Sequence, residues 1–178
     1  RAVAFANLGK HEDAQSVKSE FEAAYAIVPE ERMLFKNTAR DLLAVAEQMM
    51  LGEIAFKSGR MKEGLNHLRE AVVLDDGLMY AEPWAWPQPT RHALGALLME
   101  AGEYDEAESV YRADLGLDEK IPRPMQHPRN VWALHGLHEC LVRRGDKVEL
   151  RHVKLLLDQA LARADIPIRA SCLCRASS

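Results

Sequence analysis

Few residues in this sequence are of the kinds that build sheets or cross membranes. Aromatic residues make up 6% of the 178 residues, and Val, Ile and Thr are sparse beside Leu and Ala. Leu and Ala lose little conformational freedom in a helix, so this composition favours helices over sheets. No apolar run approaches the roughly 18 residues that a membrane-spanning helix needs, so no membrane partner is expected.

A long basic stripe is absent too. The net charge is -4, and acidic and basic residues are mixed along the chain. The electrostatic footprint of a nucleic-acid-binding protein is therefore missing. Cysteine is scarce, because three residues are an odd number and lack the density of a disulfide scaffold. That scarcity favours a reducing compartment, so we expect a cytoplasmic protein that binds no nucleic acid.

Motifs of the common enzyme classes are also missing. The sequence has no Ser-His-Asp order, phosphate-binding loop or dinucleotide fingerprint. The segment His135-Gly-Leu-His138-Glu139 differs from His-Glu-x-x-His, in which two zinc ligands lie one helical turn apart with the glutamate between them. We therefore expect a binding protein rather than an enzyme, and no cofactor.

What the sequence does contain is a phrase repeated with a period of 43 residues. Two columns share this period: the turn glycines Gly59, Gly102 and Gly145, and the helix positions Gly52, Gly95 and His138. Each phrase predicts a helix, a turn closed by a glycine in the left-handed conformation, and a second helix. Such a pair cannot bury its apolar face alone, so neighbouring pairs must stack on it.

This phrase resembles the tetratricopeptide repeat family over residues from about Leu42 to Asp165. The family pattern is matched best by Leu94-Gly95, Leu98, Gly102-Glu103-Tyr104, Ala107 and Tyr111. Three positions depart from the family pattern. Gly64 and Asp114 stand where the family has Ala, and His138 stands where it has Gly. The resemblance implies an all-α fold, a right-handed α-α superhelix of about three full helix pairs plus a partial N-terminal one. We expect one such domain over residues 1–178.

Each unit is longer than the ~34 residues usual in the family, and two proline-rich segments hold the extra residues. Residues 76–89 and 120–129 each contain several prolines, which forbid a continuous helix. Long loops of this kind, with Pro and Trp, occur in a subgroup of the family. We expect Tyr80, Trp84 and Trp86 to plug the gap between helix pairs; the alternative is an aromatic platform for a ligand.

The resemblance also implies a concave groove lined by the first helix of each pair. The family's groove positions correspond to a mixed, amphipathic set of residues in this chain. They are Met49, Glu53, Phe56, Lys57, His92, Ala96, Met99, Glu100, Trp132, His135, Glu139 and Arg143. Such a surface suits an extended peptide or a partner helix, so the predicted function is a protein-interaction scaffold.

A second hypothesis is a small-molecule or metal-binding protein, possibly with catalytic activity. His92 and His135 occupy equivalent positions, and Glu139 lies one turn from His135. Two imidazoles and a carboxylate are a possible ligand set for zinc or another transition metal, and the proline-rich segments would close over it. The alternative is that both histidines bond to neighbours or to a partner, so no metal is favoured.

The two ends of the chain lead to further expectations. The phrase Leu8-Gly9-Lys10 ends an incomplete unit, whose uncovered apolar face allows self-association through the N-terminal repeat. Because the chain begins with Arg1, we expect a fragment of a longer protein. Near the other end, Cys172 and Cys174 are expected to be an exposed, reduced pair.

Overall fold

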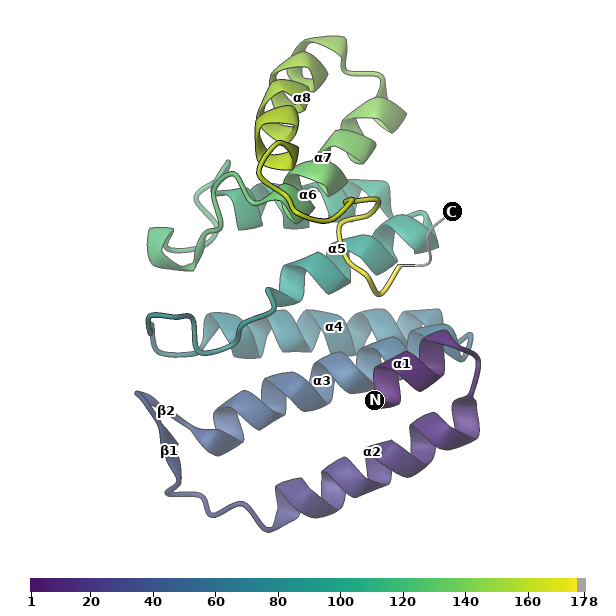
Figure 1. Ribbon diagram of the computed structural model, residues 1–178, viewed down its shortest axis with the longest axis vertical. Helices are drawn as coiled ribbons and strands as arrows, with labels where there is room; N and C mark the ends of the chain where they lie inside the picture. The colour runs from purple at the N-terminus through teal and green to yellow at the C-terminus, as the bar shows by residue number, and fades with distance from the viewer. Residues whose placement is uncertain (176–178) are drawn as a thin grey trace. The chain divides into compact units, whose positions relative to one another are not determined.

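The computed structural model describes residues 1–175 and is mostly helical (Figure 1). Its elements are α1 (Ala2–Asn7), α2 (His11–Ala26), β1 (Met33–Leu34), β2 (Asn37–Thr38), α3 (Ala39–Lys57), α4 (Met61–Asp76), α5 (Thr90–Ala101), α6 (Tyr104–Leu115), the 3-10 helix η1 (Arg123–Met125), α7 (Val131–Arg144) and α8 (Lys147–Leu161). Adjacent helices pack on one another, so the expected all-α class is confirmed. The superhelix and the extent of the repeat domain stay predictions.

The chain divides into two compact units, Arg1–Thr90 (unit 1) and Arg91 onward (unit 2). In residues 1–175 no helix has both the length and the apolar character needed to cross a membrane. The cytoplasmic location inferred from composition is not tested by this and stays a prediction.

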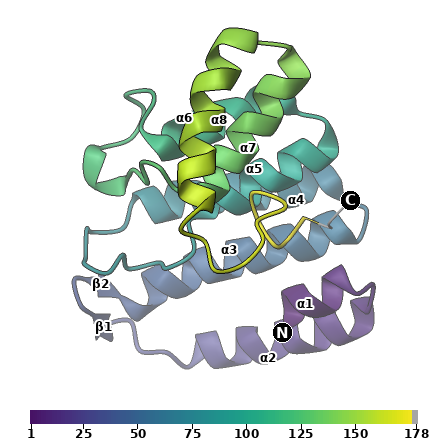
Figure 2. The same cartoon turned by 45° about the horizontal axis from the view of Figure 1, so that its top comes forward.

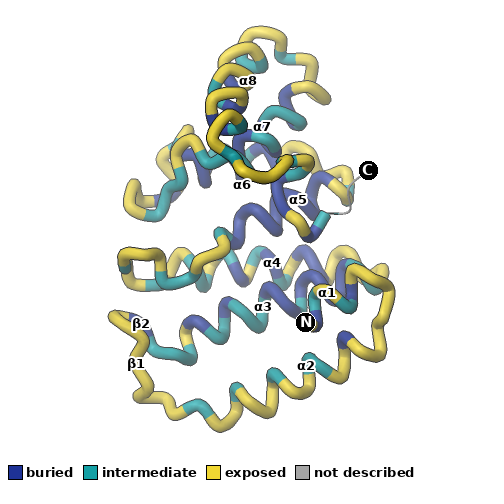
Figure 3. Tube along the Cα trace, in the orientation of Figure 1, coloured by how far each residue is buried: buried dark blue, intermediate teal, exposed yellow. Residues whose placement is uncertain are grey.

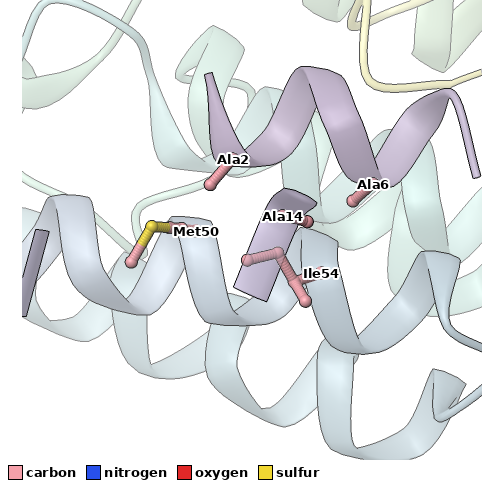
Figure 4. Close-up of a cluster of buried hydrophobic side chains, with 5 residues drawn as sticks. All are labelled: Ala2, Ala6, Ala14, Met50 and Ile54. Carbon is pink, nitrogen blue, oxygen red and sulfur yellow. The ribbon is translucent and has the colours of Figure 1, made fainter. Parts of the chain in front are cut away.

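Unit 1 begins with a short helix, α1, packed on α2 and α3. Small side chains allow this close approach (Figure 4), in a buried cluster made of Ala2, Ala6, Ala14, Met50 and Ile54. β1 and β2 then form an antiparallel hairpin with Met33 opposite Thr38. Thr38 also begins α3, because its hydroxyl accepts from the Asp41 amide while the Asp41 carboxylate accepts from the Thr38 amide.

The contact between α3 and α4 depends on two glycines. A Cβ atom on Gly64 would lie 2.6 Å from the Gly52 carbonyl oxygen, which no real Cβ tolerates. The two helix backbones therefore touch at this point. The close approach explains why Gly64 stands where the family pattern has an alanine.

Unit 2 contains α6, α7 and α8 together with all of α5 after Thr90 (Figure 2). Asn130 begins α7 and Asp146 begins α8, each accepting hydrogen bonds from two backbone amides of the first turn. The turn glycines Gly102 and Gly145 have φ values of +83° and +75°. The expected left-handed turns are thus confirmed. Figure 3 shows α5 buried along most of its length, whereas much of α8 is exposed.

Both proline-rich segments are irregular, as predicted, apart from the single turn of η1. The expected aromatic plug is wrong for two of its three residues, since Tyr80 and Trp84 are 41% and 43% exposed. The Asn37 side chain holds this segment by bonding both the N–H and the C=O of Met79. Only Trp86 turns inward, where its indole N–H lies 3.1 Å from the Met49 sulfur.

Candidate functional site

Tyr111 on α6 lies between the backbones of α5 and α7. A Cβ on Gly95 of α5 would come within 2.5 Å of the Tyr111 ring, and a Cβ on Gly136 of α7 within 2.2 Å. Only glycine leaves room for the ring on both sides. The ring is fully buried, and its hydroxyl hydrogen-bonds to the Ser171 hydroxyl at 2.5 Å. This contact joins the helices to the segment that follows α8.

Residues 166–175, here called the tail, fold back onto unit 2 after α8 (Figure 1, yellow). Ser171, Cys172 and Cys174 are buried, whereas Leu173 is 83% exposed. Cys172 and Cys174 form a disulfide. The expectation of an exposed, reduced pair is therefore wrong, because the tail covers both side chains when it docks.

The tail ends in an ion pair with α7. The Arg175 guanidinium lies 2.7 Å from a carboxylate oxygen of Glu139, and His135 Nδ1 lies 3.6 Å from the same oxygen. Burial raises the pKa of Glu139, but His135 and Arg175 outweigh burial and the pKa is lowered overall. Glu139 is therefore ionised at neutral pH and suited to a cation. We call Tyr111, His135 and Glu139 the tail site.

A second polar cluster in unit 2 is centred on Asp114 of α6. Its two carboxylate oxygens bond to His92 Nε2 at 2.9 Å and to His127 Nδ1 at 2.8 Å. Burial raises the pKa of Asp114, but the bonds from His127 and His92 outweigh it and the pKa is lowered. The His127 amide also donates to the Asp114 carbonyl. The cluster therefore anchors residues 120–129 onto α6.

The predicted groove residues fall into three classes of exposure. Buried are Met49, Glu53, Phe56, His92, Ala96 and Met99. Partly exposed are Lys57, Trp132, His135 and Glu139, and exposed are Glu100 and Arg143. Within this set, His135 and Glu139 come together in the tail site. Phe56 packs in the core beside Gly64, so it cannot offer a surface for a partner without disturbing the fold.

Glu53 on α3 is buried without full compensation. Its Oε2 has no hydrogen-bond partner among the described residues. Burial raises its pKa to about 7, and Lys57 and Asn7 oppose that rise only in part. Glu53 therefore takes up or releases a proton near neutral pH instead of presenting a fixed charge.

The two histidines of the metal hypothesis have different partners. His92 bonds to Asp114, whereas His135 faces Glu139 on its own helix. Within residues 1–175 no group of three or more His, Cys, Asp or Glu side chains is arranged to hold a metal ion. The ligand set of His92, His135 and Glu139 is therefore not assembled as one cluster in the described part of the chain.

Sequence reasoning missed several residues of both clusters. Asp114 was visible as a departure from the family pattern, but its partner His127 lies in an aperiodic segment. Tyr111 was noted only as a match to the family pattern. Ser171 and Arg175 lie where no periodicity exists, so no local pattern predicted their contacts.

Comparisons with protein-family models, with curated proteins and with solved structures found no match. The resemblance to the tetratricopeptide family therefore stays a prediction.

Proposed function

We propose that this chain is a protein-interaction scaffold that binds a peptide segment against α7. The observation that carries the proposal is the docked tail, an irregular segment held by side chains of α6 and α7. A surface that holds one irregular segment of its own chain has the shape and polarity to hold another.

The tail site is also prepared for binding before a ligand arrives. Tyr111 is fixed between Gly95 and Gly136, so little side-chain entropy is lost when its hydroxyl is engaged. With the tail in place, His135 and Arg175 lower the pKa of Glu139 against the effect of burial, so its carboxylate is charged at neutral pH and pairs with a cation. Rigid hydroxyl and carboxylate groups supply direction and specificity in peptide recognition.

A selection from a displayed random-peptide library tests the proposal, with two baits: the wild-type full chain and a full chain carrying Ser171→Ala and Arg175→Gln, in which the tail has lost its contacts with Tyr111 and Glu139. We expect enriched peptides that bind in solution and weaken about tenfold or more with Glu139→Lys, since a charge-assisted bond becomes a repulsion. The matched control is Glu119→Lys, an exposed position in the segment before α7, which is expected to leave binding unchanged. No enrichment, or equal binding to the Glu139→Lys variant, would contradict the proposal.

A second candidate function is the enclosure of a small molecule or metal beside His92. The enclosure is favoured by one observation, that His127 from a proline-rich segment approaches His92 through their shared partner Asp114, whereas these three side chains are not arranged as a metal site. Elemental analysis of protein purified without added metal tests the metal version. A stoichiometric metal supports it, whereas no metal together with unchanged melting on chelation rejects it.

Self-association through the N-terminal repeat is a further proposal about partners. Exposed apolar residues occur beside α1 and α2, at Leu8 and Ile27. Light scattering over a concentration series tests it: a mass that stays monomeric at high concentration rejects the idea.

A further inference from the structure

We propose that the tail site recognises a defined peptide pattern: a serine or threonine, a small residue, any residue, a small residue, and an arginine. Residues 171–175 are the reference ligand and occupy the site in cis. This inference rests on the proposed function and deepens it, because it names the chemistry of the partner and the reason that the site is closed in the free chain.

The first position is set by the Tyr111 hydroxyl. This hydroxyl is buried, and burial raises its pKa far above the ordinary range, so it stays a neutral donor and acceptor. A buried hydroxyl without a partner is costly, so the ligand must supply a polar atom at this depth. Ser171 does so while fully buried itself. Serine or threonine meets both requirements, since each offers a hydroxyl on a short side chain.

The last position is set by Glu139. Arg175 donates to its carboxylate at 2.7 Å, and the Arg175 side chain is only 14% exposed. Arginine stays charged at every physiological pH, and its planar group loses less hydration than an ammonium when it is covered. Glutamine in place of arginine would keep a donor but bring no positive charge to the partly buried carboxylate of Glu139.

The three residues between these anchors set the spacing and tolerate different degrees of change. Cys172 and Cys174 are buried, so only small side chains fit at their positions. Leu173 points into solvent, so any residue is accepted there. The Cys174 amide donates to the Cys172 sulfur at 3.1 Å, which holds the segment in a turn between its two anchors.

The covalent attachment of the tail makes it a strong competitor. A segment tethered by a short flexible linker experiences an effective concentration on the order of millimolar, so a free peptide binds only when the tail leaves. The tail is therefore autoinhibitory. Substitutions that weaken its two anchors, without touching Tyr111 or Glu139, should open the site.

The test is fluorescence anisotropy with a labelled, disulfide-closed synthetic peptide of residues 167–175. The receptors are the wild-type full chain and a full chain carrying Ser171→Ala and Arg175→Gln. We expect the double variant to bind the probe at least about tenfold more tightly than wild type, because its own tail has lost both anchors. A control peptide with the same two substitutions should bind the double variant about tenfold more weakly than the probe.

Two results overturn the inference: equal binding of probe and control peptides, or equal binding of the probe to both receptors. A second measurement uses the wild-type tail and does not depend on the double variant. Trypsin cleavage after Arg175 should be severalfold faster in Glu139→Gln than in wild type, while cleavage after the exposed Arg169 stays unchanged. Equal rates after Arg175 in both proteins also overturn the inference.

Failure of this inference differs from failure of the proposed function. If selected library peptides bind and depend on Glu139 but lack the hydroxyl–arginine pattern, the scaffold function stands and the named pattern falls. If no library peptide binds either receptor, both fall together.

Discussion

Unit 1 buries Glu53 on α3 and unit 2 buries Asp114 on α6, and the two carboxyl groups meet opposite surroundings. One oxygen of Glu53 has no hydrogen-bond partner, whereas both oxygens of Asp114 accept from histidines. Burial raises the pKa of Glu53 to about 7. For Asp114 burial acts in the same direction, but two donors reverse it and the pKa is lowered.

Burial alone therefore does not decide what a carboxyl group contributes to stability here. The hydrogen-bond donors beside the carboxyl group decide it. Asp114 ties a long irregular segment to a helix, so its charge supports the fold of unit 2. Glu53 supports the fold of unit 1 only while it is protonated. Four predictions test how burial and hydrogen-bond partners act on individual side chains in the two units.

The largest effect is expected from Asp114→Ala. The buried His92 and the partly buried His127 would lose their acceptor and a cavity would form, which together should lower the free energy of unfolding by about 4 kcal/mol. Chemical denaturation followed by circular dichroism measures it. The control Asp118→Ala removes a more exposed carboxylate just after the end of α6, and its effect should stay within about 0.5 kcal/mol. A loss for Asp114→Ala as small as the control would show that the cluster does not hold residues 120–129.

Glu53→Gln is expected to raise the free energy of unfolding instead of lowering it. The folded-state pKa of Glu53 is raised from 4.5 to about 7, so its favourable contribution is complete below pH 4.5 and is lost as the pH rises through 7. At about 1.4 kcal/mol for each pKa unit, Glu53→Gln should stabilise the protein by roughly 3 kcal/mol at pH 8. At pH 4 the gain should vanish.

Urea unfolding at pH 4 and pH 8 measures this pH dependence. Glu47→Gln, a partly exposed residue on the same helix, is the matched control and should show little change at either pH. A gain of equal size at both pH values would mean that the effect comes from packing and not from the proton.

A smaller effect is expected from Tyr111→Phe. The ring still fits between Gly95 and Gly136, so the loss is the hydrogen bond to Ser171, about 1 kcal/mol. The melting temperature should fall slightly. The rate of trypsin cleavage after Arg175 should nevertheless rise clearly, because the tail loses one of its two anchors while the packing of the core is kept. A large fall in the melting temperature would instead mean that the Tyr111 hydroxyl contributes strongly to the stability of the core.

No change in stability is involved in the last prediction, which concerns Cys140. Burial raises the pKa of this thiol to about 12, as burial does for Glu53. The native protein should therefore take up no maleimide at Cys140 at pH 8. After unfolding without a reductant, intact mass should show one adduct, and after reduction three, because the other two cysteines form the disulfide. Three adducts without a reductant would contradict the disulfide.

The repeated glycines show how far local pattern reaches. Gly102 and Gly145 were expected at left-handed turns, and their dihedral angles confirm it, because only glycine adopts that conformation without strain. The shared period also marked Gly95 as a repeated helix position. It did not reveal that Gly136, outside the aligned column, lies against the same Tyr111 ring.

The candidate site was predicted only in part. His135 and Glu139 were assigned to a binding surface, and the structure places both beside the tail. Phe56 and Met99, assigned by the same correspondence, lie in the core. Helical periodicity gives the face of a helix on which a residue lies, but the depth of that face depends on what covers it.

Local sequence accounts for the helix pairs of the repeat, their glycine turns and the two proline-rich interruptions, since backbone preferences and periodicity act over a few neighbouring residues. Tertiary packing sets which distant groups meet: Asp114 with two histidines, Tyr111 with Ser171, and Glu139 with Arg175. These contacts join residues far apart in the chain, where no local preference acts, so packing alone brings them together.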